Sequence, residues 1–185
     1  MLVGAIFSLI AAFVLAVEAV ELARNPNAQL SCSINAVINC ATVGVHPAAS
    51  LFGFPNSFLG LLAEPVVITV AIAGLGGVKF PRKFMFVAQL FYTLGFLFAY
   101  YLLYIGTFVI QALCPWCLVV TLSTTFVFFS MTRYNIREGN LYLSDRLAKR
   151  ASDFIEKDYD KLSVALLIVV VGAVIIIKYG SRLIA

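Results

Sequence analysis

The chain has 185 residues, of which 62% are hydrophobic and only 12% charged, and its formal net charge is +4. Its mean hydropathy is +1.01, whereas a soluble domain is usually about 45–50% apolar and about 25% charged. This composition excludes an ordinary cytosolic enzyme, a disordered protein and a secreted disulfide scaffold. At about 20 apolar residues per transmembrane helix, the length allows four or five spans.

Apolar segments predict five transmembrane helices. The first lacks the basic n-region of a signal peptide. The apolar segment 84–131 is too long for one helix, and Gly, Gln and Pro interrupt its pattern between Gly106 and Pro115, so we predict two helices there. The fourth helix then begins around Cys114 and ends near Arg133. The five predicted spans are 2–22, 57–78, the two helices within 84–131, and 162–177.

Basic residues set the predicted orientation. The loop 79–83 holds three of the 13 Lys and Arg residues and the segment 133–161 holds seven, and both lie on the same side of the predicted bundle. Because basic loops stay in the cytoplasm, the N-terminus is predicted to be cytoplasmic and the C-terminus extracytoplasmic. The positive charge is therefore a topology signal, and it does not indicate a nucleic-acid partner.

We predict an all-α membrane protein with three parts: a four-helix bundle (1–135), a cytoplasmic charged segment (136–161) and a fifth transmembrane helix (162–185). A long extracytoplasmic loop joins spans 1 and 2. Apolar residues recur at helical spacing over 143–155, which predicts an interfacial helix on anionic lipid, with a solvated charged linker as the alternative. Ser144 is a candidate cap, and the i,i+4 pairs Asp145–Lys149 and Asp153–Lys157 would stabilise this helix.

All four cysteines fall on the extracytoplasmic side in this topology, where disulfides persist. Cys32 and Cys40 lie in the long polar loop. Cys114-Pro-Trp-Cys117 is a C-x-x-C motif at the start of a helix, so its sulfurs share a helix face and the helix N-terminus favours a thiolate. This second pair lies where the head group of a lipid-soluble carrier would lie.

Two cysteine pairs, one in a wet loop and one at the lipid boundary, favour a redox relay. A static Cys32–Cys40 staple and a four-cysteine zinc site are the alternatives, and we expect no metal. A c-type haem is excluded because Leu118 stands where histidine would follow Cys117. The sequence leaves the pairing of the four sulfurs open.

Other polar residues lie near the cysteine pairs or inside the membrane. The apolar stretch 48–54 is predicted to form a short helix over the bundle mouth. Asn56 and Ser57 are candidates to bind a quinone oxygen, or to cap the second span. Trp116 is a candidate to stack on the ring. Glu64 lies inside the membrane, which makes it a candidate for a proton or polar role, whereas Glu18 and Glu21 are expected to be interfacial.

These features together resemble the vitamin K epoxide reductase family, in its bacterial disulfide-forming branch. Three separated signatures carry the resemblance and cover roughly residues 1–135. They are Cys32 and Cys40 with the seven residues between them, the segment Phe52-Gly-Phe-Pro-Asn-Ser-Phe-Leu-Gly60, and Cys114-Pro-Trp-Cys117.

The resemblance implies a four-helix bundle around a quinone of the menaquinone or ubiquinone type. Electrons would enter from a thioredoxin-like partner at Cys32, pass from Cys40 to Cys114, and leave through Cys117, which faces the quinone. Asn56 would bond a quinone oxygen. The expected function is that of a membrane thiol–disulfide oxidoreductase of the cell membrane, which supports disulfide formation in exported proteins.

Two departures from the family pattern modify this expectation. The vertebrate enzymes have Tyr where Thr121 stands, which favours a respiratory quinone over vitamin K epoxide and makes Thr121 a candidate quinone contact. Bacterial members often carry a fused thioredoxin-like domain after a fifth span, and this chain ends at Ala185, so we expect a separate partner. The alternatives are a vitamin K epoxide reductase proper, or a membrane scaffold with a structural disulfide. The other family of quinone-linked disulfide oxidases has its cysteine pairs in the reverse order.

Overall fold

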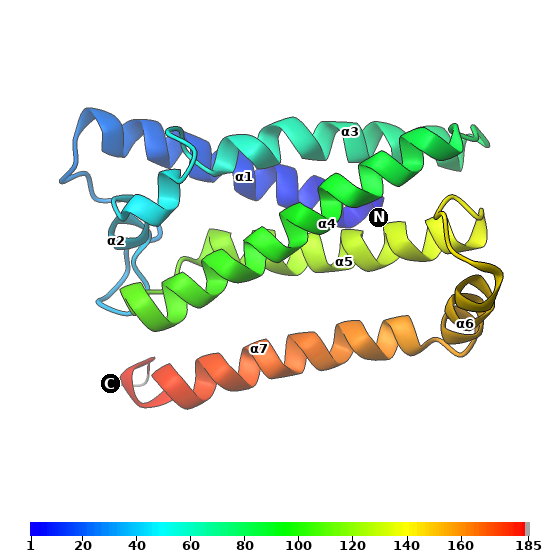
Figure 1. Ribbon diagram of the computed structural model, residues 1–185. Helices are drawn as coiled ribbons and strands as arrows, with labels where there is room; N and C mark the ends of the chain where they lie inside the picture. Colours follow the sequence, from blue (N-terminus) through cyan, green and yellow to red (C-terminus); the bar gives the residue numbers. More distant parts are fainter. Residues whose placement is uncertain (184–185) are drawn as a thin grey trace.

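The computed structural model describes residues 1–183 and is built from helices (Figure 1). Five long helices are apolar enough to cross a membrane, which confirms the predicted all-α membrane fold. They are α1 (Leu2–Arg24), α3 (Ser57–Leu75), α4 (Arg82–Tyr104), α5 (Pro115–Arg137) and α7 (Tyr159–Leu183). The shorter elements are α2 (Cys40–Gly44), the 3₁₀ turn η1 (Pro47–Ser50), the π-helix η2 (Ile105–Ile110) and α6 (Asp145–Glu156).

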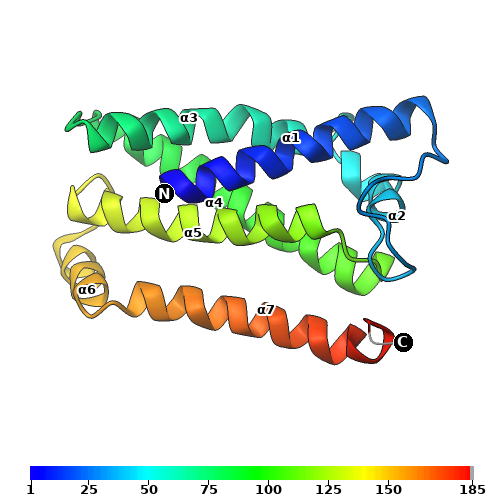
Figure 2. The ribbon, with the colours of Figure 1, turned by 180° about the vertical axis from the view of Figure 1, so that it is seen from behind.

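Four of the long helices form the bundle. α1 packs against both α3 and α5, and α4 packs against α5, whereas α3 and α4 make few close contacts. α7 lies alongside α5 on the outside of this group, as the views from the front and from behind agree (Figures 1 and 2). Small residues bring α1 and α3 together: Ala5, Ala11 and Ala12 are buried, and Gly60 faces Ala12. Close approach through small residues is typical of helix packing in membranes.

The predicted break in the segment 84–131 is confirmed. α4 continues as η2 to Ile110, and Gln111 then adopts the left-handed region with φ 59°. A short non-helical stretch follows before Pro115 begins α5, at the first helical position where proline loses no hydrogen bond. The turn places Cys114 at the same end of the bundle as the α1–α2 loop.

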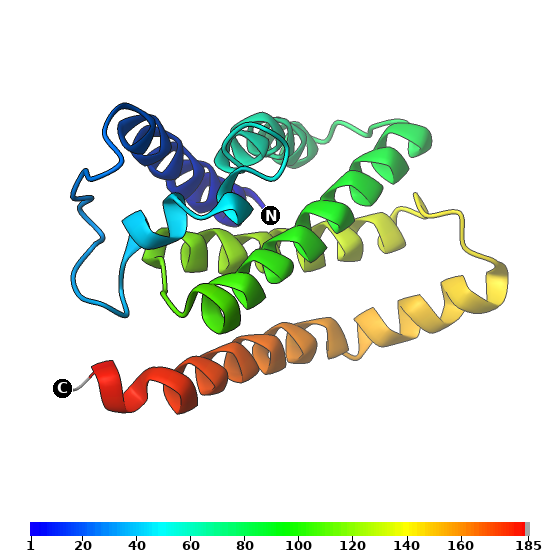
Figure 3. The same ribbon diagram turned by 60° about the vertical axis from the view of Figure 1, so that its left-hand side comes forward.

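The two ends of the molecule differ in charge and in the elements that they contain. The α1–α2 loop, α2, η1 and the end of η2 gather at one end, and α6 with the basic loops lies at the other (Figure 3). α6 matches the predicted helix in 143–155, but Ser144 makes no side-chain capping bond and neither predicted i,i+4 pair forms an ion pair. The predicted helix over 48–54 is only the single turn η1, which begins at Pro47.

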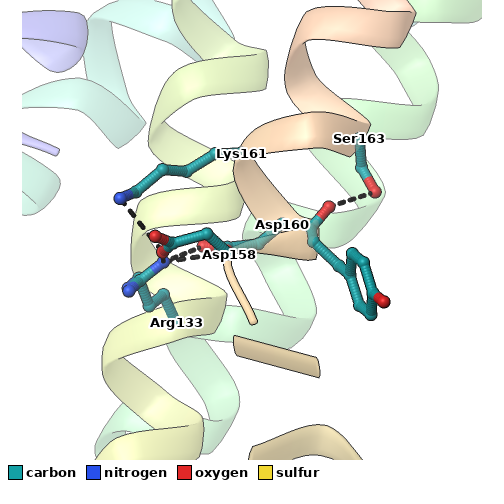
Figure 4. Close-up of polar contacts among 6 residues, drawn as sticks. Arg133, Asp158, Asp160, Lys161 and Ser163 are labelled. Carbon is teal, nitrogen blue, oxygen red and sulfur yellow. Dashed lines mark hydrogen bonds and ion pairs between the residues drawn. The ribbon is translucent and has the colours of Figure 1, made fainter. Parts of the chain in front are cut away.

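α7 is longer than the predicted span 162–177 and is attached to α5 near its first residues. Arg133 on α5 forms ion pairs with Asp158 at 3.0 Å and with Asp160 at 2.7 Å, and Lys161 also contacts Asp158 at 3.0 Å (Figure 4). Asp158 has a positive φ of 54°, which marks the turn between α6 and α7. Residues 184–185, within the predicted segment 162–185, lie outside the described residues.

Candidate active site

The two cysteine pairs lie against each other. Cys32 and Cys40 form a disulfide with their Cα atoms 5.6 Å apart, and Cys114 and Cys117 are free. The Sγ of Cys40 lies 3.4 Å from the Sγ of Cys114. This contact is close enough for thiol–disulfide exchange, in which a thiolate attacks a disulfide sulfur. The sulfur that the loop pair presents to the membrane pair is therefore that of Cys40.

A short backbone pairing holds this contact. Ile38 and Leu113 form an isolated parallel bridge. The N–H of Asn39 donates to the carbonyl of Leu113 at 3.0 Å, and the N–H of Leu113 donates to the carbonyl of Val37 at 2.7 Å. Since Cys40 follows Asn39 and Cys114 follows Leu113, the pairing brings the two cysteines together across 74 residues of sequence.

Cys114 is the N-cap residue of α5. Its Sγ accepts the backbone N–H of Cys117 at 3.3 Å, as a side-chain oxygen does in an ordinary N-cap. A hydrogen bond from the Cys117 thiol, aided by that backbone N–H, lowers the pKa of the Cys114 thiol below its usual range, although burial opposes the shift. The residue that faces Cys40 is therefore the one whose thiolate is stabilised.

Cys32 is less accessible than its polar loop suggested. Its exposed fraction is 6%, because it packs in an apolar cluster with Leu22, Leu30, Cys40 and Cys114. Trp116 packs against the same cluster and does not border the bundle cavity described below. The structure thus brings Trp116 to the cysteines and not to the place expected for a quinone ring.

Glu18 is a site residue that the sequence analysis missed. Its Oε1 lies 3.2 Å from the Sγ of Cys32, and it accepts a bond from the Ser31 hydroxyl at 3.5 Å. Glu18 is buried, whereas Glu21 is exposed. The available signal was position: Glu18 lies within the last two turns of an apolar helix, and the cysteine loop starts directly after that helix.

Glu18, Cys32 and Cys40 also bring three potential metal-ligand atoms within 4.8 Å of one another. Both sulfurs belong to the disulfide. Cysteine binds a metal as a thiolate. In the oxidised loop pair neither sulfur is a thiolate, so the arrangement suits disulfide exchange better than metal binding.

A cavity of about 1290 Å³ lies beneath the cysteines within the bundle. Its walls are mostly apolar, and both Cys114 and Cys117 border it. Side chains of both α3 and α4 line the cavity, and these two helices make few close contacts with each other. Binding sites for small molecules usually measure about 300–1,000 Å³, so this one has room for a ring and part of an apolar tail.

Asn56 borders this cavity, but its side chain is largely engaged elsewhere. Its Oδ1 accepts the N–H of Leu51 at 3.2 Å, and its Nδ2 donates to the carbonyl of Ala48 at 2.7 Å. It makes no capping bond to α3, so the capping alternative is wrong for Asn56. It fastens the η1 segment over the cavity mouth and keeps one N–H for another partner.

Ser57 and Thr121 line the cavity from opposite helices. The Ser57 hydroxyl is buried and has no hydrogen-bond partner among the described residues. The Thr121 hydroxyl donates to the carbonyl of Cys117 at 2.9 Å, within its own helix. A hydroxyl oxygen that donates can still accept a bond, and the unpaired Ser57 hydroxyl is the feature that a polar ligand group would satisfy.

Glu64 joins three helices at a deeper level of the cavity. The Ser8 hydroxyl of α1 donates to its Oε1 at 2.8 Å, and the Tyr92 hydroxyl of α4 donates to the same atom at 3.1 Å. The Oε2 atom is buried without a hydrogen-bond partner among the described residues. The Oε1 atom therefore links α3 to both α1 and α4 through hydrogen bonds, whereas Oε2 is left for another polar partner.

Paired cysteines in contact at the mouth of an apolar cavity, inside a bundle of transmembrane helices, define a membrane thiol–disulfide redox protein. The sequence matches the model of the Vitamin K epoxide reductase family over residues 1–132. The chain therefore belongs to this family, whose members use cysteine redox chemistry in membranes and are generally quinone-linked. No curated protein matches the chain. The matched region holds all four cysteines and ends within α5, before α6 and α7 begin.

Proposed function

We propose that this protein oxidises the dithiol of a separate thioredoxin-like protein and passes the electrons through its two cysteine pairs to a quinone. The observation that carries the proposal is the 3.4 Å contact between Cys40 and Cys114. It connects a loop disulfide to a cysteine pair that borders the apolar cavity. The net reaction converts one dithiol and one quinone into one disulfide and one hydroquinone, so two electrons and two protons move together.

The protein's part is a series of disulfide exchanges. With Cys114 and Cys117 joined, the Cys40 thiolate attacks the Cys114 sulfur and Cys117 leaves as a thiolate. Cys32 then attacks Cys40, which releases Cys114 and forms the Cys32–Cys40 disulfide. The described pairing, with the loop pair joined and the membrane pair free, corresponds to the state after this step. The dithiol partner subsequently reduces the loop disulfide at Cys32.

The cavity fits a quinone on two counts. Its apolar walls suit an apolar ring and tail, and the Ser57 hydroxyl and the Glu64 Oε2 are buried polar atoms without partners. Asn56, Ser57, Thr121 and Glu64 are the residues that would hold the ring through its oxygens. A bound quinone would supply a two-electron acceptor next to Cys117. A menaquinone or ubiquinone type fits this apolar site.

The test uses purified protein with 2-methyl-1,4-naphthoquinone and a reduced thioredoxin-like protein, and follows quinone absorbance and partner thiols together. We expect equimolar loss of quinone and of partner dithiol. Cys114→Ala and Cys117→Ala should each abolish turnover, while Ser163→Ala, on the exposed side of α7, should not change it. Full turnover in both cysteine variants would contradict the proposal. Reduction of vitamin K epoxide in the same assay would instead favour a vitamin K epoxide reductase, and no quinone reduction at all would favour a scaffold.

We further propose that the cysteine end faces the extracytoplasmic side of the cell membrane. The support is that the basic loops lie at the opposite end (Figure 1). In a variant without native cysteines, Asn27→Cys should react with a membrane-impermeant maleimide on intact cells, and Lys79→Cys should not. The reverse labelling would overturn this orientation.

α6 is proposed to lie on anionic lipid at the other surface. Leu147 and Phe154 are exposed apolar residues on a helix that is otherwise rich in charge and that also carries Arg146, Lys149 and Arg150. A peptide of α6 should bind vesicles that contain phosphatidylglycerol and not vesicles of phosphatidylcholine alone. Equal binding to both would contradict an electrostatic contribution.

A further inference from the structure

α7 contacts the cysteine end of the bundle through Tyr179, with Ile175 and Lys178 beside it. The side chain of Tyr179 is fully buried, with an exposed fraction of 0%. Its hydroxyl donates to the carbonyl of Thr107 in η2 at 2.7 Å. Its ring packs in an apolar cluster with Val37 and Leu113, to which Ile175 of the same helix adds. Tyr179 therefore contacts three separate segments of the chain.

Two of these segments carry the reactive cysteines. Val37 and Leu113 take part in the backbone pairing around the Ile38–Leu113 bridge, because the N–H of Leu113 donates to the carbonyl of Val37 at 2.7 Å. Cys40 lies three residues after Val37, and Cys114 directly follows Leu113. The Tyr179 ring thus packs against the pairing that sets the distance between Cys40 and Cys114.

The third segment, η2, precedes the non-helical stretch that leads to Cys114. η2 ends at Ile110, the backbone of Gln111 after it is left-handed, and the N–H of Ala112 donates to the carbonyl of Gly106 at 3.2 Å. From Ala112 to Cys114 the chain is in no helix. The hydroxyl of Tyr179 fixes η2 at Thr107, immediately before this non-helical stretch.

The other end of α7 is also fixed. Arg133 on α5 binds both Asp158 and Asp160 at the start of α7 (Figure 4). α5 is the helix whose first turn carries Cys117. An ion-pair attachment at one end and a buried hydroxyl attachment at the other set the axial position of Tyr179 against α5.

We propose that Tyr179 is a positioning residue that holds Cys40 within exchange distance of Cys114, so that α7 serves electron transfer between the two pairs. Its physiological meaning rests on the proposed function, because only a relay needs this exchange. The chemistry itself can be measured without a quinone or a protein partner. The role of Tyr179 can therefore be disproved without disproving the proposed function, and the reverse.

The test measures how strongly the fold favours a Cys40–Cys114 disulfide. In the Cys32→Ala/Cys117→Ala background only these two thiols remain, and glutathione disulfide oxidises them to one protein disulfide with release of two glutathione thiols. The equilibrium constant is read from the fraction of protein that resists alkylation at a series of glutathione ratios. We expect Tyr179→Leu to lower it about tenfold or more, equivalent to about 30 mV.

Tyr179→Phe keeps the ring and removes the bond to Thr107, so we expect a smaller decrease of about threefold. Ile177→Ala, at an exposed position two residues earlier on the same helix, should leave the constant unchanged. A Tyr179→Leu constant within twofold of the unsubstituted background would overturn the proposal. Should Tyr179→Leu fail to fold, Tyr179→Phe decides, and a constant equal to that of the background would overturn it.

Discussion

The Glu64 carboxyl is predicted to stabilise the bundle by accepting hydrogen bonds from α1 and α4, a role called here a polar tie. Replacing Glu64 by Leu or by Gln distinguishes this role from proton transfer. Glu64→Leu removes the acceptor of both the Ser8 and the Tyr92 hydroxyls. Hydrogen bonds between membrane helices contribute about 0.6 kcal/mol on average and at most about 1.7. A buried hydroxyl left unpaired costs about 1–3 kcal/mol. With two hydroxyls affected, we expect Glu64→Leu to lower the free energy of unfolding by about 2–4 kcal/mol.

Glu64→Gln is the matched variant, because the amide oxygen can accept both bonds in the same place. We expect a loss below about 1 kcal/mol, from the altered chemistry of the second atom. The measurement is reversible unfolding of the purified protein in mixed micelles, by titration with sodium dodecyl sulfate and circular dichroism. Quinone turnover is followed in the same preparations at a temperature where each variant is folded.

The two roles predict different turnover. A polar tie predicts that Glu64→Gln retains most of the activity, whereas a proton donor to the quinone predicts that it loses activity as Glu64→Leu does. Equal stability of Glu64→Leu and Glu64→Gln would refute the structural reasoning, since the bonds to Oε1 would then contribute nothing. A stable but inactive Glu64→Gln would show that the acidic proton matters.

Three further predictions concern packing, the carboxylate at the loop pair, and pH. Gly60→Ala should destabilise by about 1–2 kcal/mol, because the new Cβ would lie 2.8 Å from the Ala12 Cβ and overpacking costs about 1–3 kcal/mol, more than the helix propensity gained. Glu18→Gln should raise the alkylation rate of Cys32 in the fully reduced protein severalfold, because a carboxylate at 3.2 Å accepts a hydrogen bond from the thiol and repels the thiolate, and so favours the unreactive thiol. Reduced Cys114 should react with methyl methanethiosulfonate at its full rate at a lower pH than an ordinary thiol of pKa about 8.5 does, because the pKa of Cys114 is lowered. The rate should decline as the pH falls through that lowered pKa.

Each of these has a matched control. Gly95→Ala has no atom within 4 Å of the new Cβ and should leave stability equal or higher, so a loss as large as that of Gly60→Ala would contradict the packing argument. Glu21→Gln, at an exposed site on α1, should leave the alkylation rate of Cys32 unchanged. Cys117→Ala removes the thiol that donates to Cys114, and it should therefore shift the pH midpoint of Cys114 upward. An unchanged midpoint would assign the lowered pKa to the helix end alone.

Much of the transmembrane fold could be predicted because hydropathy and proline placement are local properties of the sequence. The break before Pro115 and the apolar spans follow from such signals. The loop pairing of Cys32 with Cys40 could not be derived, since four thiols allow several pairings. The capping alternative for Asn56 failed because its carbonyl oxygen and amide nitrogen found backbone partners in the η1 segment, which no local pattern encodes.

Contacts between distant segments explain what the sequence analysis missed. Glu18 looked interfacial because it lies near a helix end, but the loop that follows α1 folds back and buries it against Cys32. The contact of α7 with the cysteine segments joins distant parts of the sequence, because Tyr179 lies more than sixty residues from Cys114. Such contacts depend on helix placement, and hydropathy does not specify helix placement.

The burial of Cys32 bears on the proposed entry of electrons from a dithiol partner. Cys32 is 6% exposed and lies in an apolar cluster with Cys40, so a partner's sulfur would need an opening in that cluster to reach it. Cys32 is carried by the segment 25–39, which has no helix of its own and follows the end of α1. In the proposed relay, docking of the partner would therefore displace part of that segment, while the pairing of Ile38 with Leu113 would keep Cys40 beside Cys114. The loop thus needs one mobile half that carries Cys32 and one fixed half that carries Cys40, and the clustering of its tertiary contacts around residues 37–40 meets the second requirement.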